Sequence, residues 1–237
     1  MSEVTIAGQT PAYVAESKAA TTAVIVIHEV WGLNDQIRSV ADRLAAEGFL
    51  ALAPDLLVGT GIAEQMTPEL IAQMFDPVTR DLAQPKLRAA MAPIQSPEFG
   101  AKTVERLKAC FDYLMSQPGI TKVVAMGFCF GGSYSFSLAC AEPKLAAAIV
   151  FYGHAPAEDQ LAKINCPVYG YYGQTDTALV DALPELAATM KRLGKHFDYK
   201  VYPNVGHAFF NDTNPVTYNK ETADDAWAKV LATLKSL

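Results

Sequence analysis

Six short apolar runs alternate with longer segments of helical periodicity, and this alternation constrains the fold more than any other feature of the sequence. Several of the runs are apolar at successive positions, as expected of strands that are covered on both faces. The alternation predicts right-handed crossovers and an α/β fold, with a mainly parallel central sheet and helices on both faces. The predicted strands are Ala23–His28, Leu50–Ala53, Val123–Gly127, Ala146–Tyr152, Val168–Tyr172 and Phe197–Tyr202, after a hairpin of Val4–Ile6 and Ala12–Ala15 that turns at Gly8.

The helical segments are bounded by recognisable start and stop residues. Asn34 or Asp35 is placed to cap the first helix, and Gly48 to end it. Three further helices are predicted at Phe99–Met115, Asp181–Leu193 and Thr222–Leu234.

The stretch from Leu57 to Pro97 is the least regular, with several prolines and two weak helices at Pro68–Phe75 and Thr79–Met91. We expect this stretch to be an excursion from the sheet within a single domain of residues 1–237.

Composition and charge exclude several classes of protein. The net charge is −6 and no basic run is present, which argues against binding to nucleic acid or to an anionic membrane. The polar N-terminal segment does not resemble a signal peptide, and the apolar runs are too short to span a bilayer, so we expect a cytoplasmic protein. The four cysteines contain no C-x-x-C pair, which argues against a zinc site and a disulfide framework.

The strongest chemical signal is Cys129, in the pattern Gly127-x-Cys129-x-Gly131-Gly132. A predicted strand precedes it and a helical segment follows, which is the nucleophile-elbow arrangement with cysteine in the serine position. The side chain would project from the carboxyl edge of the sheet at a helix N-terminus, where the helix dipole favours a thiolate and free N–H groups can hold an oxyanion. The alternative interpretation is a buried cysteine in a glycine-rich turn.

A base and an orienting acid are expected after the nucleophile in the order acid, then base. Asp176 follows the end of the strand at Val168–Tyr172, and His207 follows the end of the last strand, so both lie at the same sheet edge as Cys129. They are the predicted acid and base, although a turn aspartate and a solvated loop histidine are the simpler interpretations. His28 lies at the exit of the first core strand and is expected to be structural.

Glu29 follows His28 at the position where this arrangement supplies an N–H to the oxyanion. A carboxylate there would oppose negative charge on an incoming thiol. The functional interpretation is that Glu29 lies near Cys129 and exchanges a proton with it, and the alternative is a surface glutamate in a loop.

At these residues the chain resembles the dienelactone hydrolase (carboxymethylenebutenolidase) family of α/β-hydrolases over nearly its whole length. The motifs that carry the resemblance are Ala12-Tyr13-Val14-Ala15, His28-Glu29-x-Trp31-Gly32, Pro54-Asp55-Leu56, Gly127-Phe-Cys129-Phe-Gly131-Gly132, Gly173-x-x-Asp176 and Gly206-His207-x-Phe209.

The resemblance implies a monomeric, cofactor-free enzyme that opens an enol-lactone or similar ester. It implies that the N–H groups of Val30 and Phe130 hold the oxyanion. It further implies that Glu29 keeps the resting thiol protonated and removes the proton when substrate arrives. Candidates for substrate contact are Trp31, Asn211, Tyr152 and Arg88.

One departure from the family pattern bears on the substrate. Members that act on dienelactone hold the substrate carboxylate with arginines, one of them four residues after the histidine, where this chain has Asn211. Asparagine lacks the bidentate grip of arginine on a carboxylate. The second arginine would come from the irregular stretch, as Arg80 or Arg88. The sequence therefore favours the same reaction type on a substrate other than dienelactone itself.

Two other functions remain open from the sequence. One is a general carboxylesterase or thioesterase with the same triad. The other is a thiol sensor or small-molecule binding protein that keeps the fold without turnover, because a fold does not fix a function.

Overall fold

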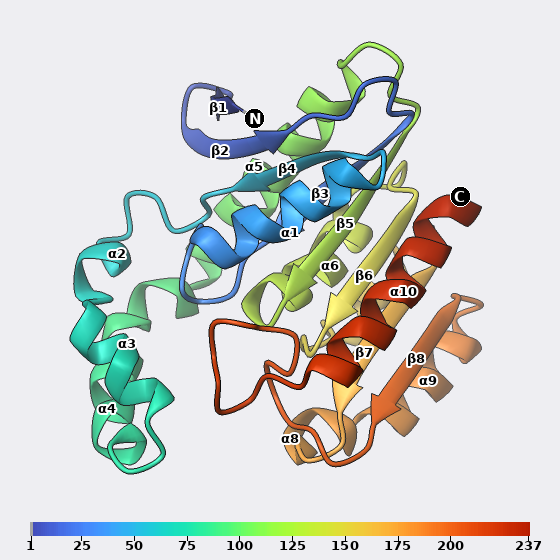
Figure 1. Ribbon diagram of the computed structural model, residues 1–237. Coiled ribbons are helices and arrows are strands. Elements are labelled where there is room, and N and C mark those ends of the chain that lie inside the picture. Colours follow the sequence, from blue (N-terminus) through green and yellow to red (C-terminus); the bar gives the residue numbers. More distant parts are fainter. Residues whose placement is uncertain (1) are drawn as a thin grey trace.

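The computed structural model describes residues 2–237, which contain an eight-stranded sheet in the order β1-β2-β4-β3-β5-β6-β7-β8 (Figure 1). The six strands β4, β3, β5, β6, β7 and β8 run parallel, and β2 pairs antiparallel with both β1 and β4. The predicted mainly parallel α/β sheet is confirmed. The strands are β1 (Ser2–Ile6), β2 (Thr10–Ala15), β3 (Thr22–Ile27), β4 (Leu50–Pro54), β5 (Lys122–Phe128), β6 (Ala147–Phe151), β7 (Val168–Gly173) and β8 (Phe197–Tyr202).

The central strands bury nearly every residue, because helices cover the sheet on both faces. All residues of β3, β4 and β6 are buried. In the parallel register Ile27 of β3 lies opposite Gly127 of β5, and Phe128 lies opposite Phe151 of β6. The carboxyl ends of these strands therefore meet at one edge, and the loops that follow them are brought together.

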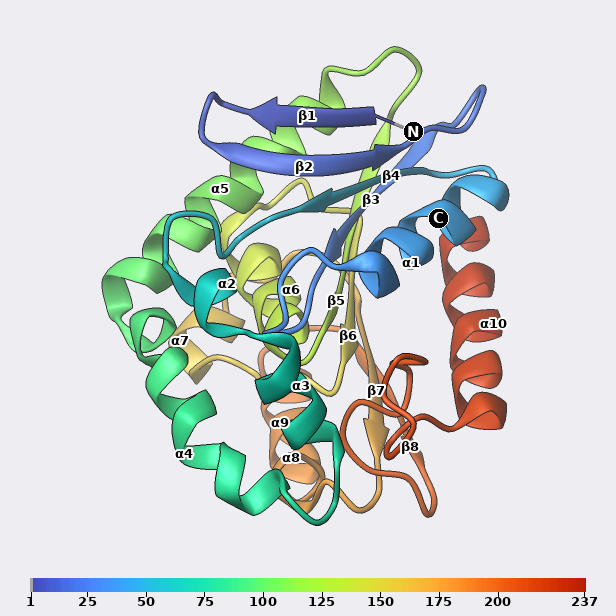
Figure 2. The same cartoon turned by 60° about the vertical axis from the view of Figure 1, so that its left-hand side comes forward.

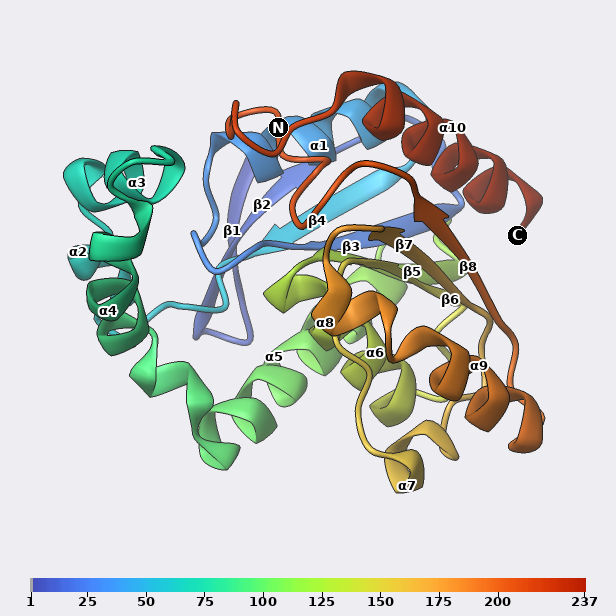
Figure 3. The same ribbon diagram turned by 90° about the horizontal axis from the view of Figure 1, so that it is seen from below.

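The helices form two layers, with α1 and α10 on one face of the sheet and α5, α6 and α9 on the other (Figure 3). Their bounds are α1 (Asp35–Ala46), α2 (Ile62–Gln65), α3 (Pro68–Phe75), α4 (Arg80–Ala90), the 3-10 helix η1 (Ala92–Gln95), α5 (Pro97–Met115), α6 (Phe130–Ala141), α7 (Glu158–Leu161), α8 (Thr177–Val180), α9 (Leu183–Arg192) and α10 (Lys220–Ser236). The first helix is capped by Asn34, whose side chain accepts a hydrogen bond from the N–H of Ile37, and Gly48 follows its end with φ +99°.

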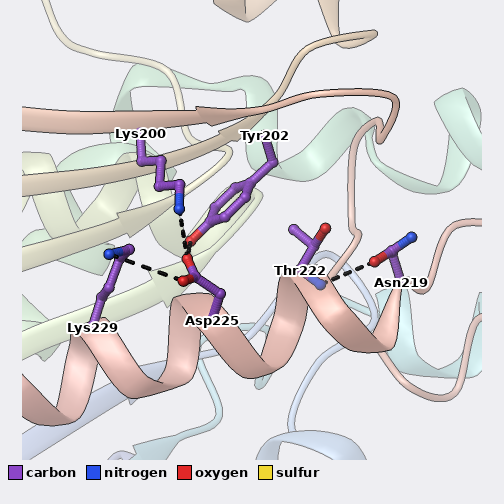
Figure 4. Close-up of polar contacts among 6 residues, drawn as sticks. All are labelled: Lys200, Tyr202, Asn219, Thr222, Asp225 and Lys229. Carbon is purple, nitrogen blue, oxygen red and sulfur yellow. Dashed lines mark hydrogen bonds and ion pairs between the residues drawn. The ribbon is translucent and has the colours of Figure 1, made fainter.

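The last helix, α10, is fixed to the edge strand β8 through Asp225. The carboxylate accepts hydrogen bonds from Lys200 Nζ and from the Tyr202 hydroxyl, both at 2.8 Å (Figure 4). The side chain of Asn219 caps the helix by accepting from the N–H of Thr222 at 2.9 Å. These contacts hold the loop between β8 and α10 at both of its ends, and that loop carries His207.

The irregular stretch forms helices α2, α3, α4 and η1, which stand beyond the carboxyl edge of the sheet (Figure 2). The expected weak helices are both present, at Pro68–Phe75 and Arg80–Ala90. Their buried apolar side chains make a hydrophobic cluster separate from the main core, and the cluster packs against Val30, Trp31, Phe130 and Tyr134. The excursion is therefore attached to the loop after β3 and to the first turns of α6, the helix that follows Cys129.

The main difference from the predicted elements lies after β7. The helix expected from Asp181 begins at Leu183, because Pro184 fits the first turn of a helix, and the short helix α8 precedes it. The four-residue helices α2 and α7 were not predicted, since one turn carries no periodic pattern. No helix within residues 2–237 is both long enough and apolar enough to cross a bilayer.

Candidate active site

Cys129 occupies the sharp turn between β5 and α6, with φ +55° and ψ −113°. This backbone conformation is strained for a residue with a side chain. The turn is held by its backbone, since the Cys129 N–H donates to the Phe151 carbonyl at 3.0 Å and the Cys129 carbonyl accepts from the Ser133 N–H at 3.1 Å. The predicted strand–cysteine–helix arrangement is present in the structure.

The two flanking glycines allow the elements around the turn to approach. A Cβ atom at Gly127 would lie 2.0 Å from the carbonyl oxygen of Gly131, and one at Gly131 would lie 2.1 Å from the carbonyl oxygen of Ile27. Real Cβ atoms do not come so close to backbone atoms, so neither position accepts a side chain without moving β3 or α6. The glycines of the motif are required by packing.

Asp176 and His207 are joined by a hydrogen bond of 2.6 Å between Oδ2 and Nδ1. Their two loops interlock, since the Thr175 N–H donates to the Val205 carbonyl and a Cβ atom at Gly173 would lie 2.4 Å from the Gly206 carbonyl. Burial lowers the pKa of His207, but hydrogen bonding and charge interactions with Asp176 and Cys129 outweigh it and raise the pKa to about 10. Because Nδ1 of His207 is bonded to Asp176, Nε2 is the ring nitrogen that remains to interact with Cys129.

Glu29 leaves the same edge of the sheet as Cys129, because each follows the paired residues Ile27 and Gly127 by two positions, and both line one cavity. Its side chain is buried, and Oε2 accepts a hydrogen bond of 2.6 Å from Nδ2 of Asn211. Burial raises the pKa of the Glu29 carboxyl, against the opposing influence of Asn211, His207 and Tyr152. Glu29 is therefore not a surface glutamate.

Tyr152 is buried behind the site at φ +39°, with its ring centroid 4.9 Å from that of His207. Burial, reinforced by the negative charges of Glu29 and Cys129, raises the pKa of the Tyr152 hydroxyl well above its ordinary value. The Tyr152 hydroxyl and Glu29 Oε1 influence each other's ionisation, but within residues 2–237 neither atom has a hydrogen-bond partner of good geometry. They are the two unsatisfied polar atoms of the site.

His28 is fully buried and structural, as predicted. Its Nδ1 bonds to the Glu29 carbonyl at 2.6 Å, and its Nε2 accepts from the Leu56 N–H at 3.0 Å, so the ring is neutral with the proton on Nδ1. Because C=O and N–H point in opposite directions across a trans peptide, anchoring the Glu29 carbonyl also fixes the direction of the Val30 N–H.

A cavity of about 650 Å³ lies over these groups. Of the predicted residues, the structure brings Glu29, Val30, Trp31, Cys129, Asp176 and His207 to its wall. Asn211 and Tyr152 are buried and do not line it, while Phe130 packs on the excursion and stacks on His28 at 5.7 Å.

Arg88 is exposed on α4 and does not reach the cavity, whereas Arg80 at the start of the same helix lines it. Met74, Phe75, Gln84 and Leu87 of the excursion also line the cavity. Sequence reasoning missed these four, because no local pattern shows which face of a short helix meets a distant loop. Within residues 2–237 no group of three histidine, cysteine or acidic side chains is arranged to hold a metal ion.

Comparison with known proteins decides the family. Residues 10–237 match the sequence model of the Dienelactone hydrolase family. The chain belongs to the dienelactone hydrolase family. A relative from Saccharolobus solfataricus, named "Putative carboxymethylenebutenolidase", is 35% identical over 94% of this chain and 93% of its own length. A relative of the same name from Synechocystis is 32% identical over 94% of this chain and 89% of its own length.

A solved structure from Klebsiella pneumoniae, named "Putative Dienelactone Hydrolase", has a TM-score of 0.81 at 25% identity, covering 100% of this chain and 98% of that one. The predicted α/β-hydrolase fold is confirmed by this likeness. Membership of the dienelactone hydrolase family makes the chain an ester hydrolase acting on a small molecule.

Proposed function

We propose that the protein opens an enol-lactone or a related carboxylic ester through a covalent intermediate on Cys129. The observation that carries the proposal is the placement of Cys129, on a strained turn in the wall of a cavity that also holds the hydrogen-bonded pair His207–Asp176. A nucleophile, a base within reach and an acid that orients the base are the groups that acyl transfer needs.

In the first step the sulfur of Cys129 attacks the carbonyl carbon, and the thiol proton passes to a neighbouring base. The Val30 and Phe130 N–H groups, which make no hydrogen bond to another residue within 2–237, stabilise the oxyanion. Collapse of the tetrahedral intermediate breaks the C–O bond, leaves a thioester on Cys129 and passes the proton from that base to the leaving oxygen. His207 then takes a proton from water, whose oxygen attacks the thioester, and gives that proton to the sulfur as the C–S bond breaks, which regenerates the thiol.

Asp176 keeps the imidazole of His207 in one tautomer with Nδ1 protonated, so that Nε2 faces the reacting atoms. Two groups that line the cavity together with Cys129 are candidates to exchange a proton with its sulfur, His207 and Glu29. Trp31 and the excursion residues Phe75 and Leu87 supply apolar wall to the cavity.

The cavity's charge points to the substrate class. Within the described chain, Arg80 is the one lysine or arginine that lines the cavity, and it makes no ion pair there. Asn211 is engaged with Glu29 and does not face the cavity. We therefore propose that Arg80 holds a carboxylate when the substrate carries one, and that neutral esters need no such contact.

The function is tested by steady-state hydrolysis of a dienelactone and of a neutral aryl ester. Cys129→Ala should abolish turnover of both substrates, while Cys110→Ala, a change in the buried part of α5, should keep it within a few-fold. Turnover of the aryl ester alone would favour a general carboxylesterase. Labelling of Cys129 without hydrolysis of any ester or thioester would favour a thiol sensor and refute the proposal.

Arg80 is tested against Arg88, which lies on the same helix away from the cavity. Arg80→Ala should raise KM for the carboxylate-bearing lactone about 5- to 10-fold, the size of one exposed charge-assisted contact of about 1 kcal/mol, with little change for the aryl ester. Arg88→Ala should change neither. Equal effects of the two substitutions would exclude Arg80 from substrate binding.

A further inference from the structure

The carboxyl group of Glu29 is held by a neutral amide in place of a cation. The residue is 3% exposed, and Oε2 accepts from Asn211 Nδ2 at 2.6 Å. Among residues 2–237 no lysine or arginine forms an ion pair with Glu29. A buried carboxylate without a cation is costly, and the neutral acid is the form that burial favours.

The orientation of the Asn211 amide is fixed by a second residue. Its Oδ1 accepts from the backbone N–H of Thr213 at 3.0 Å and from the Thr213 hydroxyl at 2.7 Å. A backbone N–H can only donate, so Oδ1 must face Thr213 and the NH₂ group must face Glu29. Asn211 therefore gives Glu29 one donor at Oε2 and cannot serve Oε1.

The other carboxyl oxygen is left without a donor. Oε1 of Glu29 is buried and lacks a partner, as does the nearby hydroxyl of Tyr152. An ionised carboxylate needs donors at both oxygens, whereas an un-ionised acid with its proton on Oε1 is itself a donor there, and the oxygen of the neighbouring Tyr152 hydroxyl can accept. The arrangement fits the acid.

Burial raises the pKa of the Glu29 carboxyl and outweighs the hydrogen bonds from Asn211 and Tyr152 and the charge of His207, which all lower it. Cys129 and Tyr152 add no positive charge, and Asp176 and Arg80 line the cavity beyond. His207 favours the ionised form when it carries a proton, but the carboxylate of Asp176 is 2.6 Å from its ring and offsets that charge. The net direction is a raised pKa for Glu29, with burial as the largest cause.

We propose that Glu29, which is buried and positioned by the neutral amide of Asn211 in place of a cation, is an un-ionised carboxylic acid in the resting enzyme, so that His207 takes the proton of the Cys129 thiol. The S–H bond breaks, its electron pair stays on sulfur, and the proton moves to Nε2 of His207 while Glu29 keeps its own proton. This inference rests on the proposed function of Cys129. It differs from the family expectation, in which Glu29 is the resting base, because a neutral acid does not oppose negative charge on the sulfur.

Infrared difference spectroscopy tests the protonation state directly. The spectrum of wild type minus Glu29→Gln at about pH 7 should contain the carbonyl band of an un-ionised carboxylic acid. The same subtraction is then made in the Asn211→Arg background, where a cation lies beside the carboxyl. The spectrum of Asn211→Arg minus that of the double variant with Glu29→Gln should contain carboxylate bands in place of the acid band. Carboxylate bands in the wild-type difference spectrum would overturn the proposal, and this outcome does not depend on the folding of Asn211→Arg.

The protonation state of Glu29 also affects how fast the Cys129 thiol reacts. We measure this rate by alkylation with iodoacetamide between about pH 5 and 9, followed by mass spectrometry of the peptide that contains Cys129. Glutamine reproduces the charge of the un-ionised acid, so the Glu29→Gln and wild-type rates should agree within about threefold at each pH. If Glu29 were ionised at rest, removing its charge would speed alkylation by about tenfold or more, since one pKa unit is a factor of ten. Asn211→Arg should slow alkylation only when Glu29 is present.

These measurements remain separate from the test of ester hydrolysis. A protein that alkylates as predicted but hydrolyses no ester would contradict the proposed function and leave the protonation of Glu29 standing.

Discussion

The strained backbone at Cys129 predicts that glycine there stabilises the protein while alanine does not. Both substitutions remove the thiol, so the difference between them isolates the effect of Cβ at φ +55°. Releasing such strain contributes about 1–3 kcal/mol, and glycine costs about 0.5–1 kcal/mol in backbone entropy. Cys129→Gly should therefore be more stable than Cys129→Ala by about 1 kcal/mol, or roughly 2–4 °C in Tm for a chain of this size.

The matched control is Cys110, which is buried in the interior of α5. There Cys110→Gly should be less stable than Cys110→Ala by about 1 kcal/mol, because helical backbone favours alanine. Urea denaturation followed by circular dichroism gives both differences. The reasoning is refuted if the glycine variant is no more stable than the alanine variant at position 129, since the turn would then store no strain.

Three further predictions concern the proposed triad and the turn that carries Cys129. Asp176→Asn should lower kcat/KM by two to four orders of magnitude, because the 2.6 Å bond that fixes the His207 tautomer is altered, with KM much less affected. Gly131→Ala should cost more than about 3 kcal/mol in urea denaturation because its Cβ would lie 2.1 Å from the Ile27 carbonyl, whereas Gly194→Ala, with open space around it at φ +68°, should cost only about 1 kcal/mol. The His207 pKa, raised from 6.5 to about 10, means that its stabilising proton is fully retained below pH 6.5 and lost as pH rises toward 10. Since 43% of the His207 side chain is exposed, solvent screening limits this loss to roughly 1 kcal/mol, and a wild-type curve that shows no more decline than that of His207→Gln would contradict it.

The sequence predicts the sheet and the triad because their signals are local or follow from chain order. Strand-length apolar runs fix β3 to β8, and a polar residue after each strand end must lie at the shared edge. Chain order therefore predicts Asp176 and His207 at this edge, although they are far from Cys129 in the chain. The contact between Asn211 and Glu29 has no such signal, since it joins residues 182 positions apart and depends on how the loop after His207 folds back.

The excursion shows a second limit of sequence reasoning. Periodicity located α3 and α4, but the choice of Arg80 over Arg88 as the arginine in the cavity depends on how these helices pack on Val30 and Trp31. The positive φ of Tyr152 is likewise invisible in the sequence, because the residue is bulky and aromatic and has no local preference for that conformation.

The central claim, that Cys129 carries the acyl group, is tested most directly by trapping the intermediate. His207→Ala should attack a reactive aryl ester slowly and fail to activate water, so that the acyl-enzyme accumulates. Acid quenching, digestion and mass spectrometry should then find one acyl group on the peptide that contains Cys129, and none in the double variant with Cys129→Ala. An acyl group on another residue, or hydrolysis that survives Cys129→Ala undiminished, would contradict the account.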